Sequence, residues 1–204
     1  DIRGAGNLLG DEQSGHIKEV GFELYQGMLE EAIIEEKAGG GPRAEEFSPQ
    51  ISVDAPILIP EHYVPDLDLR MGLYRRLGDL EDKRAIDEYA AELIDRFGPL
   101  PDEVEALLKV ILVKALCRAA NVEKVEAGPK GAVVTLRNNE FPDPGALVAF
   151  VSDSAQQAHV RPDQKLVFAR NWPTPEARLK GTAAILSRLA RLAEGSGARA
   201  TVPA

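Results

Sequence analysis

Residues 101–119, PDEVEALLKVILVKALCRA, form the stretch on which the fold depends. Apolar side chains recur along it with the period of an α-helix. They are Val104, Leu107, Leu108, Ile111, Leu112, Ala115, Leu116 and Ala119. Val110 and Val113 place further apolar groups on the other sides. Because a helix that is apolar nearly all round is normally buried, we predict that this one is the centre of the domain. Asp102 and Glu105 have the spacing of a capping box that would open it.

Two more helices are predicted upstream of this central one. The first begins at Asp66 or Asp68 and runs to about Leu80, with Arg75 and Arg76 near its C-terminal end, where the helix dipole favours cations. The second covers residues 83–97 and is stopped by Gly98-Pro99. Its apolar stripe consists of Ile86, Tyr89, Ala90, Leu93, Ile94 and Phe97.

The outer side of the 83–97 helix carries a straight row of carboxylates. Glu88, Glu92 and Asp95 lie at i, i+4 and i+7, and Arg96 follows Glu92 by four residues, a spacing that favours an ion pair. The row has two interpretations. It is either a switchable contact for a basic surface or simply a solvated face.

The period of the pattern changes after the central helix. Residues 122–127 and 132–136 are rich in β-formers and are joined by Gly128-Pro129-Lys130-Gly131, which is typical of a hairpin. The elements predicted after them are a short helix at 142–152, a second strand pair at 158–160 and 165–169, and a last helix from Thr174 to about 194.

These elements predict an α+β fold. An N-terminal helical hairpin or hook precedes a compact domain of about five helices packed with two small antiparallel β-hairpins. We expect the hook to occupy residues 1–41, a linker residues 42–50, the compact domain residues 51–194 and a flexible tail residues 195–204. Within the compact domain, residues 51–54 alternate in polarity and predict a short strand.

Composition narrows the possible functions of the 204-residue chain. Its formal net charge is −9 and its pI about 5.0, which opposes broad contact with nucleic-acid phosphates and favours protein partners. A single cysteine, Cys117, lies in the apolar central helix, where we expect a small core residue. No apolar run reaches the length of a membrane span and no leader pattern begins the chain, so we expect a cytoplasmic protein.

The sequence lacks the patterns of common catalytic sites. There is no phosphate-binding G-x-x-x-x-G-K-[ST] loop, and no Cys/His set has the spacing of a metal site. His16, His62 and His159 are scattered along the chain. We therefore expect no catalytic residues, no metal and no cofactor in this chain itself.

The first stretch of the chain carries a specific resemblance. Residues 1–15, DIRGAGNLLGDEQSG, contain the pattern R-G-x-G-x-x-L-G-x-x-Q-S-G. It resembles the translocation motif of bacterial transcription-repair coupling factors and of ATP-dependent branch-migration helicases. Residues 74–76 (YRR) and 92–98 (ELIDRFG) resemble the C-terminal domain that is particular to the coupling factors. Because the chain begins within the motif, we expect a C-terminal fragment of a longer protein.

The resemblance implies a parent protein that is an ATP-dependent double-stranded DNA translocase. Such a protein displaces stalled RNA polymerase and recruits an excision-repair protein, using ATP and Mg²⁺ in its motor lobes. By the resemblance, the C-terminal domain is autoinhibitory and masks a recruitment surface on an N-terminal, repair-protein-like module of the same polypeptide. Glu92, Asp95 and Arg96 would then make the masking contact, with Glu88 completing the row, and Arg3 and Gln13 would couple the motor to DNA movement.

Other functions stay open at this point. The chain could be a stand-alone acidic protein-interaction module, or a small hydrolase with an unrecognised carboxylate pair. Gly4, Gly6 and Gly10 approach a dinucleotide-binding fingerprint. Only three residues precede Gly4, however, so the strand that this fingerprint requires has no room.

Overall fold

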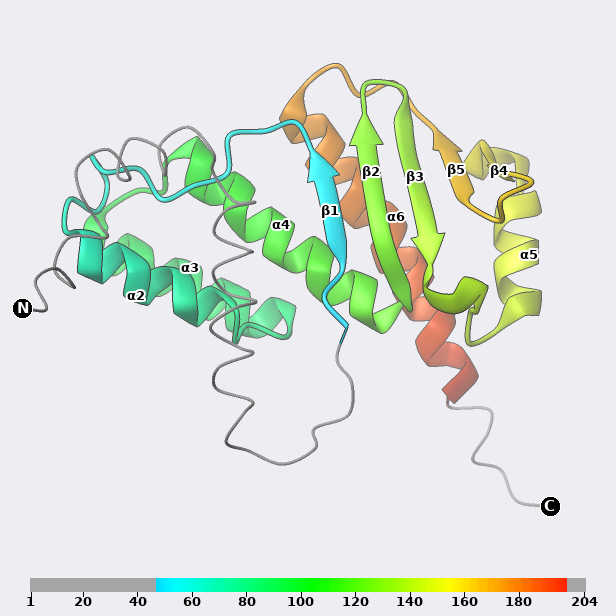
Figure 1. Ribbon diagram of the computed structural model, residues 1–204, viewed down its shortest axis with the longest axis horizontal. Coiled ribbons are helices and arrows are strands. Elements are labelled where there is room, and N and C mark those ends of the chain that lie inside the picture. Colours follow the sequence, from blue (N-terminus) through cyan, green and yellow to red (C-terminus); the bar gives the residue numbers. More distant parts are fainter. Residues whose placement is uncertain (1–46, 198–204) are drawn as a thin grey trace, which may run out of the picture.

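The computed structural model describes residues 47–197, which form an α+β fold of helices and one five-stranded sheet, as expected (Figure 1). The helices are α2 (Leu67–Leu77), α3 (Lys83–Phe97), α4 (Asp102–Ala119), α5 (Pro144–Ser152) and α6 (Pro175–Gly197). The strands are β1 (Gln50–Val53), β2 (Val122–Gly128), β3 (Gly131–Leu136), β4 (Ala158–Val160) and β5 (Leu166–Ala169). The predicted hook at residues 1–41 lies outside the described residues.

The two predicted hairpins are β2–β3 and β4–β5, and the structure joins them into one sheet of order β1-β2-β3-β5-β4. β3 and β5 pair antiparallel, with Gly131 opposite Ala169 and Val134 opposite Leu166. Strand β1 adds to the other edge, parallel to β2, with Ile51 opposite Val125. Pairing the hairpins satisfies backbone groups that two separate hairpins would leave unpaired at their edges.

The sheet is covered on one face by helices. In Figure 1, α6 and the second half of α4 lie behind the strands, and α5 stands beside β4 at the right. Helices α2 and α3 lie together at the left end of the view, beyond β1. The covered face buries Val125, Val134 and Phe168, and the first and last of these have no exposed surface. Alternation between buried and partly exposed residues along β3 matches a sheet with one face in the core.

Helix α4 belongs to two hydrophobic clusters, which explains why it is apolar nearly all round. Its first half supplies the helical cluster shared with α2 and α3, through Val104, Leu107, Leu108, Val110 and Ile111. Its second half supplies the sheet cluster, through Val113 and Cys117. The prediction that this helix is central is therefore confirmed. Cys117 is a buried core residue, as expected. Burial raises the pKa of its thiol to about 12, so it stays protonated.

Buried tyrosines fix α3 against its neighbours. The hydroxyl of Tyr89 donates to the carbonyl of Leu73 on α2 at 2.9 Å. The hydroxyl of Tyr63 donates to the carbonyls of Leu93 at 3.1 Å and of Gly98 at 2.9 Å, at the C-terminal end of α3. Burial raises the pKa of both phenols, which keeps them neutral donors. These bonds set which side of α3 faces solvent.

Some local predictions differ from the structure. The capping box does not form, because Pro101 is the N-cap of α4 and Asp102 and Glu105 both lie in its first turn. Ile94, predicted in the stripe of α3, is 49% exposed, because it sits at the flank of a stripe whose buried members are Ile86, Tyr89 and Leu93. Helix α6 continues to Gly197, beyond the predicted end at about 194.

Candidate functional site

A cluster of charges on the surface bridges α2 and α3. Arg76 lies in the last turn of α2, and Glu92 and Arg96 lie one turn apart on α3. The guanidinium of Arg76 donates from Nη1 to Glu92 Oε1 at 2.7 Å and from Nη2 to Oε2 at 2.6 Å. Arg96 Nη1 donates to the same Oε1 at 3.0 Å. We call these residues the Arg76–Glu92–Arg96 cluster.

Each of the two arginine side chains lies over an aromatic ring of α3. The guanidinium carbon of Arg76 lies 5.1 Å from the ring centre of Tyr89, and that of Arg96 lies 5.0 Å from the ring centre of Phe97. A guanidinium at this distance from a ring gains cation–π attraction of about 0.5–1 kcal/mol at exposed sites. Since Tyr89 is itself anchored to the backbone of α2, its ring is a fixed support for the Arg76 side chain.

The two guanidinium groups determine the electrostatics of the cluster. Hydrogen bonds from Arg76, and then from Arg96, lower the pKa of Glu92 to about 2. The same contact with Glu92 raises the pKa of Arg76. The side chain of Glu92 is 34% exposed, so the cluster is at the surface and within reach of a partner. One carboxylate serves two cations, which leaves a surplus of one positive charge.

Of the three carboxylates in the predicted acidic row, Glu92 has surroundings that differ most from the prediction. Glu88 accepts a single bond from Arg84 within α3 at 2.8 Å, and both side chains are largely exposed. Glu92 is neutralised by the cluster, as described above. Asp95 is exposed and makes no ion pair with any residue in the described range 47–197. The row Glu88, Glu92 and Asp95 does face outward, but its members differ in the charge that they offer.

The sequence predicted the Glu92–Arg96 pair and missed Arg76. The spacing of four residues within one helix indicated the first contact, which the structure confirms. The second joins residues 16 positions apart on different helices, and no single-helix pattern encodes it. The sequence places Arg76 near the C-terminal end of a helix and within the YRR resemblance, and neither observation indicates a partner on another helix. The remaining predicted residues, Arg3 and Gln13, lie outside the described part of the chain.

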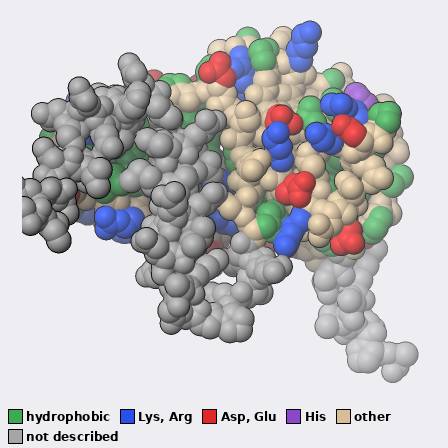
Figure 2. Space-filling view, viewed as in Figure 1, with side chains coloured by type: hydrophobic (Ala, Val, Ile, Leu, Met, Phe, Trp, Pro, Cys, Tyr) green, Lys and Arg blue, Asp and Glu red, His purple; other side chains and the backbone are tan. Residues whose placement is uncertain are grey.

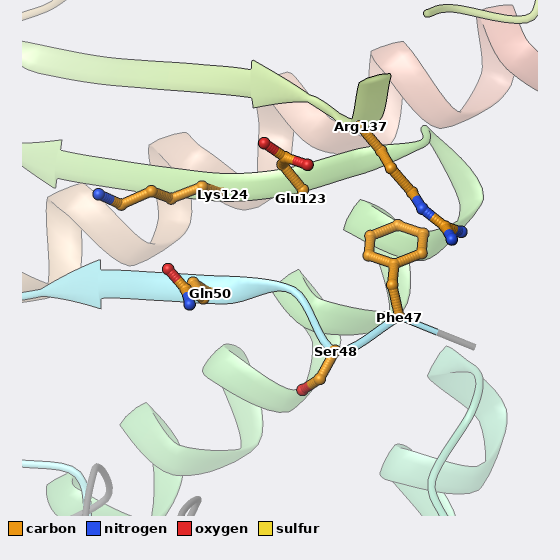
Figure 3. A pocket seen from close by; sticks show the side chains of 6 residues that line it. All are labelled: Phe47, Ser48, Gln50, Glu123, Lys124 and Arg137. Atoms are coloured by element: carbon orange, nitrogen blue, oxygen red, sulfur yellow. The ribbon is translucent and has the colours of Figure 1, made fainter. Parts of the chain in front are cut away.

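A shallow pocket of about 370 Å³ lies elsewhere, where β1 meets β2. It is lined by Phe47, Ser48, Gln50, Glu123, Lys124 and Arg137 (Figure 3). The guanidinium carbon of Arg137 lies 4.6 Å from the ring centre of Phe47. Nothing in the sequence had indicated this pocket, because its walls come from three separate segments. Its charges are mixed and do not select one kind of ligand.

The described residues show neither a metal-binding cluster nor a membrane-spanning helix, and no stripe of one charge over the sheet. Over the sheet, the face seen in Figure 2 intersperses Lys and Arg with Asp and Glu, so neither sign forms a stripe there. Within residues 47–197, no three His, Cys, Asp or Glu side chains gather to hold a metal ion. None of the described helices is both long and apolar enough to cross a membrane.

The cluster predicts a pH dependence that can be measured directly. We expect Glu92→Gln to lower the free energy of unfolding by about 1 kcal/mol at pH 7, because two guanidiniums lose their shared partner. The pKa of Glu92 lies near 2 in the folded chain against an ordinary value of 4.5, so its contribution is complete above pH 4.5 and is lost as the pH falls toward 2. Urea denaturation should therefore show the difference between wild type and variant shrinking from pH 7 to about pH 2.5.

A matched control for this measurement is Glu88→Gln. It removes a single-donor pair within one helix, which we expect to change the stability by only a few tenths of a kcal/mol. If both variants had the same effect at pH 7, the fork between Arg76 and Glu92 would carry no special stability.

Comparison with known proteins agrees with this architecture. A model of the TRCF domain family matches residues 53–147. A transcription-repair-coupling factor of Rickettsia bellii is 43% identical over 171 residues, which are 83% of this chain and 15% of that protein. The Escherichia coli protein of the same name is 31% identical over 183 residues, which are 88% of this chain and 16% of that protein. This chain thus spans about a sixth of the length of these relatives.

A solved structure supports the fold independently. The crystal structure of a C-terminal domain of transcription-repair coupling factor superposes with a TM-score of 0.65 and 21% identity, covering 74% of this chain and 98% of that one. Its fold is shared by the domain in Figure 1. From the matched domain model and the relatives that cover most of its length, this chain belongs to the family of transcription-repair-coupling factors.

Proposed function

We propose that this chain is the C-terminal part of an ATP-dependent double-stranded DNA translocase of the bacterial cytoplasm. The parent protein would displace stalled RNA polymerase and couple transcription to nucleotide excision repair. The shared name of the relatives supports the coupling role, and residues 1–15 resemble a translocation motif. In this proposal the DNA, the polymerase, ATP and Mg²⁺ are bound by other parts of the parent, and Arg3 and Gln13 transmit motor movement to the DNA.

We further propose that residues 51–194 form an autoinhibitory domain. Its docking surface is the α3 face, which we define as Glu88, Glu92, Asp95 and Arg96. This face would pack against an N-terminal, repair-protein-like module of the same polypeptide and so mask the surface that recruits the excision-repair protein. The observation that carries the proposal is the ordered, surface-exposed Arg76–Glu92–Arg96 cluster, next to the exposed carboxylate of Asp95.

The strength of such a contact suits a switch. Exposed ion pairs contribute about 0.2–1 kcal/mol each, so a few of them make roughly 1–3 kcal/mol. Since about 1.4 kcal/mol corresponds to a factor of ten in an equilibrium constant, the domain would be held mostly closed and could still be released by a rearrangement of the motor.

Reversing the charge of Asp95 in the parent protein tests the proposal. We expect Asp95→Lys to raise the affinity of the parent for the excision-repair protein about tenfold in the absence of polymerase, since the closed state loses about 1.4 kcal/mol. Isothermal titration of the two proteins would measure this. Asp95 points to solvent and takes no part in the core, so the domain should still fold.

The control is Asp87→Lys, which reverses another exposed carboxylate of α3 that pairs with Lys83 and lies outside the α3 face. It makes the same change in net charge and should leave the affinity unchanged. An Asp95→Lys parent that folds normally and binds the repair protein no better than wild type would place the masking contact elsewhere.

A further inference from the structure

Arg76 is placed by contacts that come from two helices. It projects from the last turn of α2, its fork binds both oxygens of Glu92 on α3, and its guanidinium lies over the ring of Tyr89. Tyr89 in turn donates its hydroxyl to the carbonyl of Leu73 on α2. The Arg76–Glu92 ion pair joins α2 to α3. A bidentate arginine–carboxylate pair fixes direction as well as distance.

Arg96 is placed less firmly and depends on Glu92. It makes one bond to Glu92 Oε1, at 3.0 Å, and that oxygen is the one that Arg76 Nη1 also binds. A lone pair at i, i+4 on an exposed helix holds its side chains only weakly. The order of placement therefore runs from Arg76 to Glu92 and from Glu92 to Arg96.

We infer that Arg76 is a positioning residue for the α3 face: by fixing the carboxylate of Glu92 it holds Glu92 and Arg96 in one arrangement before the partner module arrives. This inference rests on the proposed masking contact. Arg76 itself lies on α2 and need not touch the partner. Binding through side chains that are already ordered avoids the entropy cost of immobilising them, so loss of Arg76 weakens the contact without removing any of its contacting groups.

Arg76→Lys separates this role from a simple link between two helices. Lysine keeps the positive charge and the aliphatic stem over Tyr89, but it has no planar fork to bind both oxygens of Glu92. We expect the parent protein carrying Arg76→Lys to bind the excision-repair protein about three- to tenfold more tightly, because the mask is weakened. Its thermal midpoint should stay within a few degrees of wild type. Arg76→Met, which also removes the charge, should have the larger effect of the two.

Arg75→Lys is the matched control. Arg75 precedes Arg76, is exposed on the same helix, and supplies none of the hydrogen bonds of the cluster. The same chemical change there should alter neither the affinity nor the arrangement of the cluster.

A second readout uses the 204-residue chain and does not depend on the partner. Carbon-detected NMR titration of the Glu92 carboxyl should give a pKa that rises toward its ordinary value in Arg76→Lys and is unchanged in Arg75→Lys. A Glu92 pKa that does not move in Arg76→Lys would overturn the inference by itself, because Arg76 would then not be what holds that carboxylate.

The two proposals fail differently. If Asp95→Lys releases the mask and Arg76→Lys does not, the α3 face is the masking surface but Arg76 only links the helices, and the inference is wrong. If neither variant changes the affinity, the masking contact itself is misplaced and both proposals fall. Release by both variants, with an unchanged control, supports both.

Discussion

We expect Gly131→Ala to lower the free energy of unfolding by about 2–5 kcal/mol, the sum of a positive-φ strain and an overpacking cost. Gly131 begins β3 with φ +126°, a conformation that side chains rarely adopt. A Cβ there would lie 1.9 Å from the carbonyl oxygen of Phe168 and 2.9 Å from the backbone nitrogen of Arg170. Both atoms belong to the backbone, so the strands themselves would have to separate.

Gly128→Ala is the control, because Gly128 lies in the same β2–β3 turn with open space around its Cβ position. Its effect should stay within about 1 kcal/mol, the ordinary range for such an exchange. Urea denaturation followed by circular dichroism measures both variants. Equal, small effects would mean that β5 does not approach the turn as closely as the structure has it.

The crowding at Gly131 also marks the limit of what the sequence could predict of the fold. The turn 128–131 was recognisable from its glycines and proline. Its backbone, however, accepts bonds from the segment that follows β5: Arg170 N–H donates to Lys130 O at 2.9 Å, and Trp172 N–H donates to Pro129 O at 2.8 Å. These contacts join residues 40 or more positions apart. Local periodicity gave each hairpin and the bounds of α3, but it carries no information on which hairpin edges pair.

In the candidate site, too, contacts within one helix could be predicted from the sequence, whereas contacts between helices could not. The outward row on α3 and the pair Glu92–Arg96 follow from helical spacing alone, so they could be predicted. The role of Arg76 depends on how α2 packs against α3, which is set by buried groups such as Leu73 and Tyr89. Sequence reasoning therefore paired Glu92 with Arg96 alone, whereas the packed helices pair it with two arginines, Arg76 and Arg96.

A second large effect is expected at Leu107, in the first half of α4. Its side chain is 1% exposed and belongs to the helical cluster. Leu107→Ala should lower the free energy of unfolding by about 2–5 kcal/mol. The substitution removes the transfer free energy of the buried atoms and leaves a cavity whose walls lose packing contacts. For a chain of this size each kcal/mol lowers the melting temperature by roughly 2–4 °C. Leu112→Ala, at a partly buried position on the same helix, should have a smaller effect.

Leu107→Ala also tests whether the two clusters unfold together. Trp172, the one tryptophan of the chain, belongs to the sheet cluster, whereas Leu107 belongs to the helical one. Because α4 runs through both, we expect tryptophan fluorescence and far-ultraviolet circular dichroism to shift by the same amount and to report a single transition. The fluorescence midpoint could instead stay at its wild-type value while the dichroism signal shows an additional, earlier unfolding phase. In that case α2 and α3 would unfold separately from the sheet. The α3 face would then be stabilised by the helical cluster alone, and a change in the sheet could not reach it through α4.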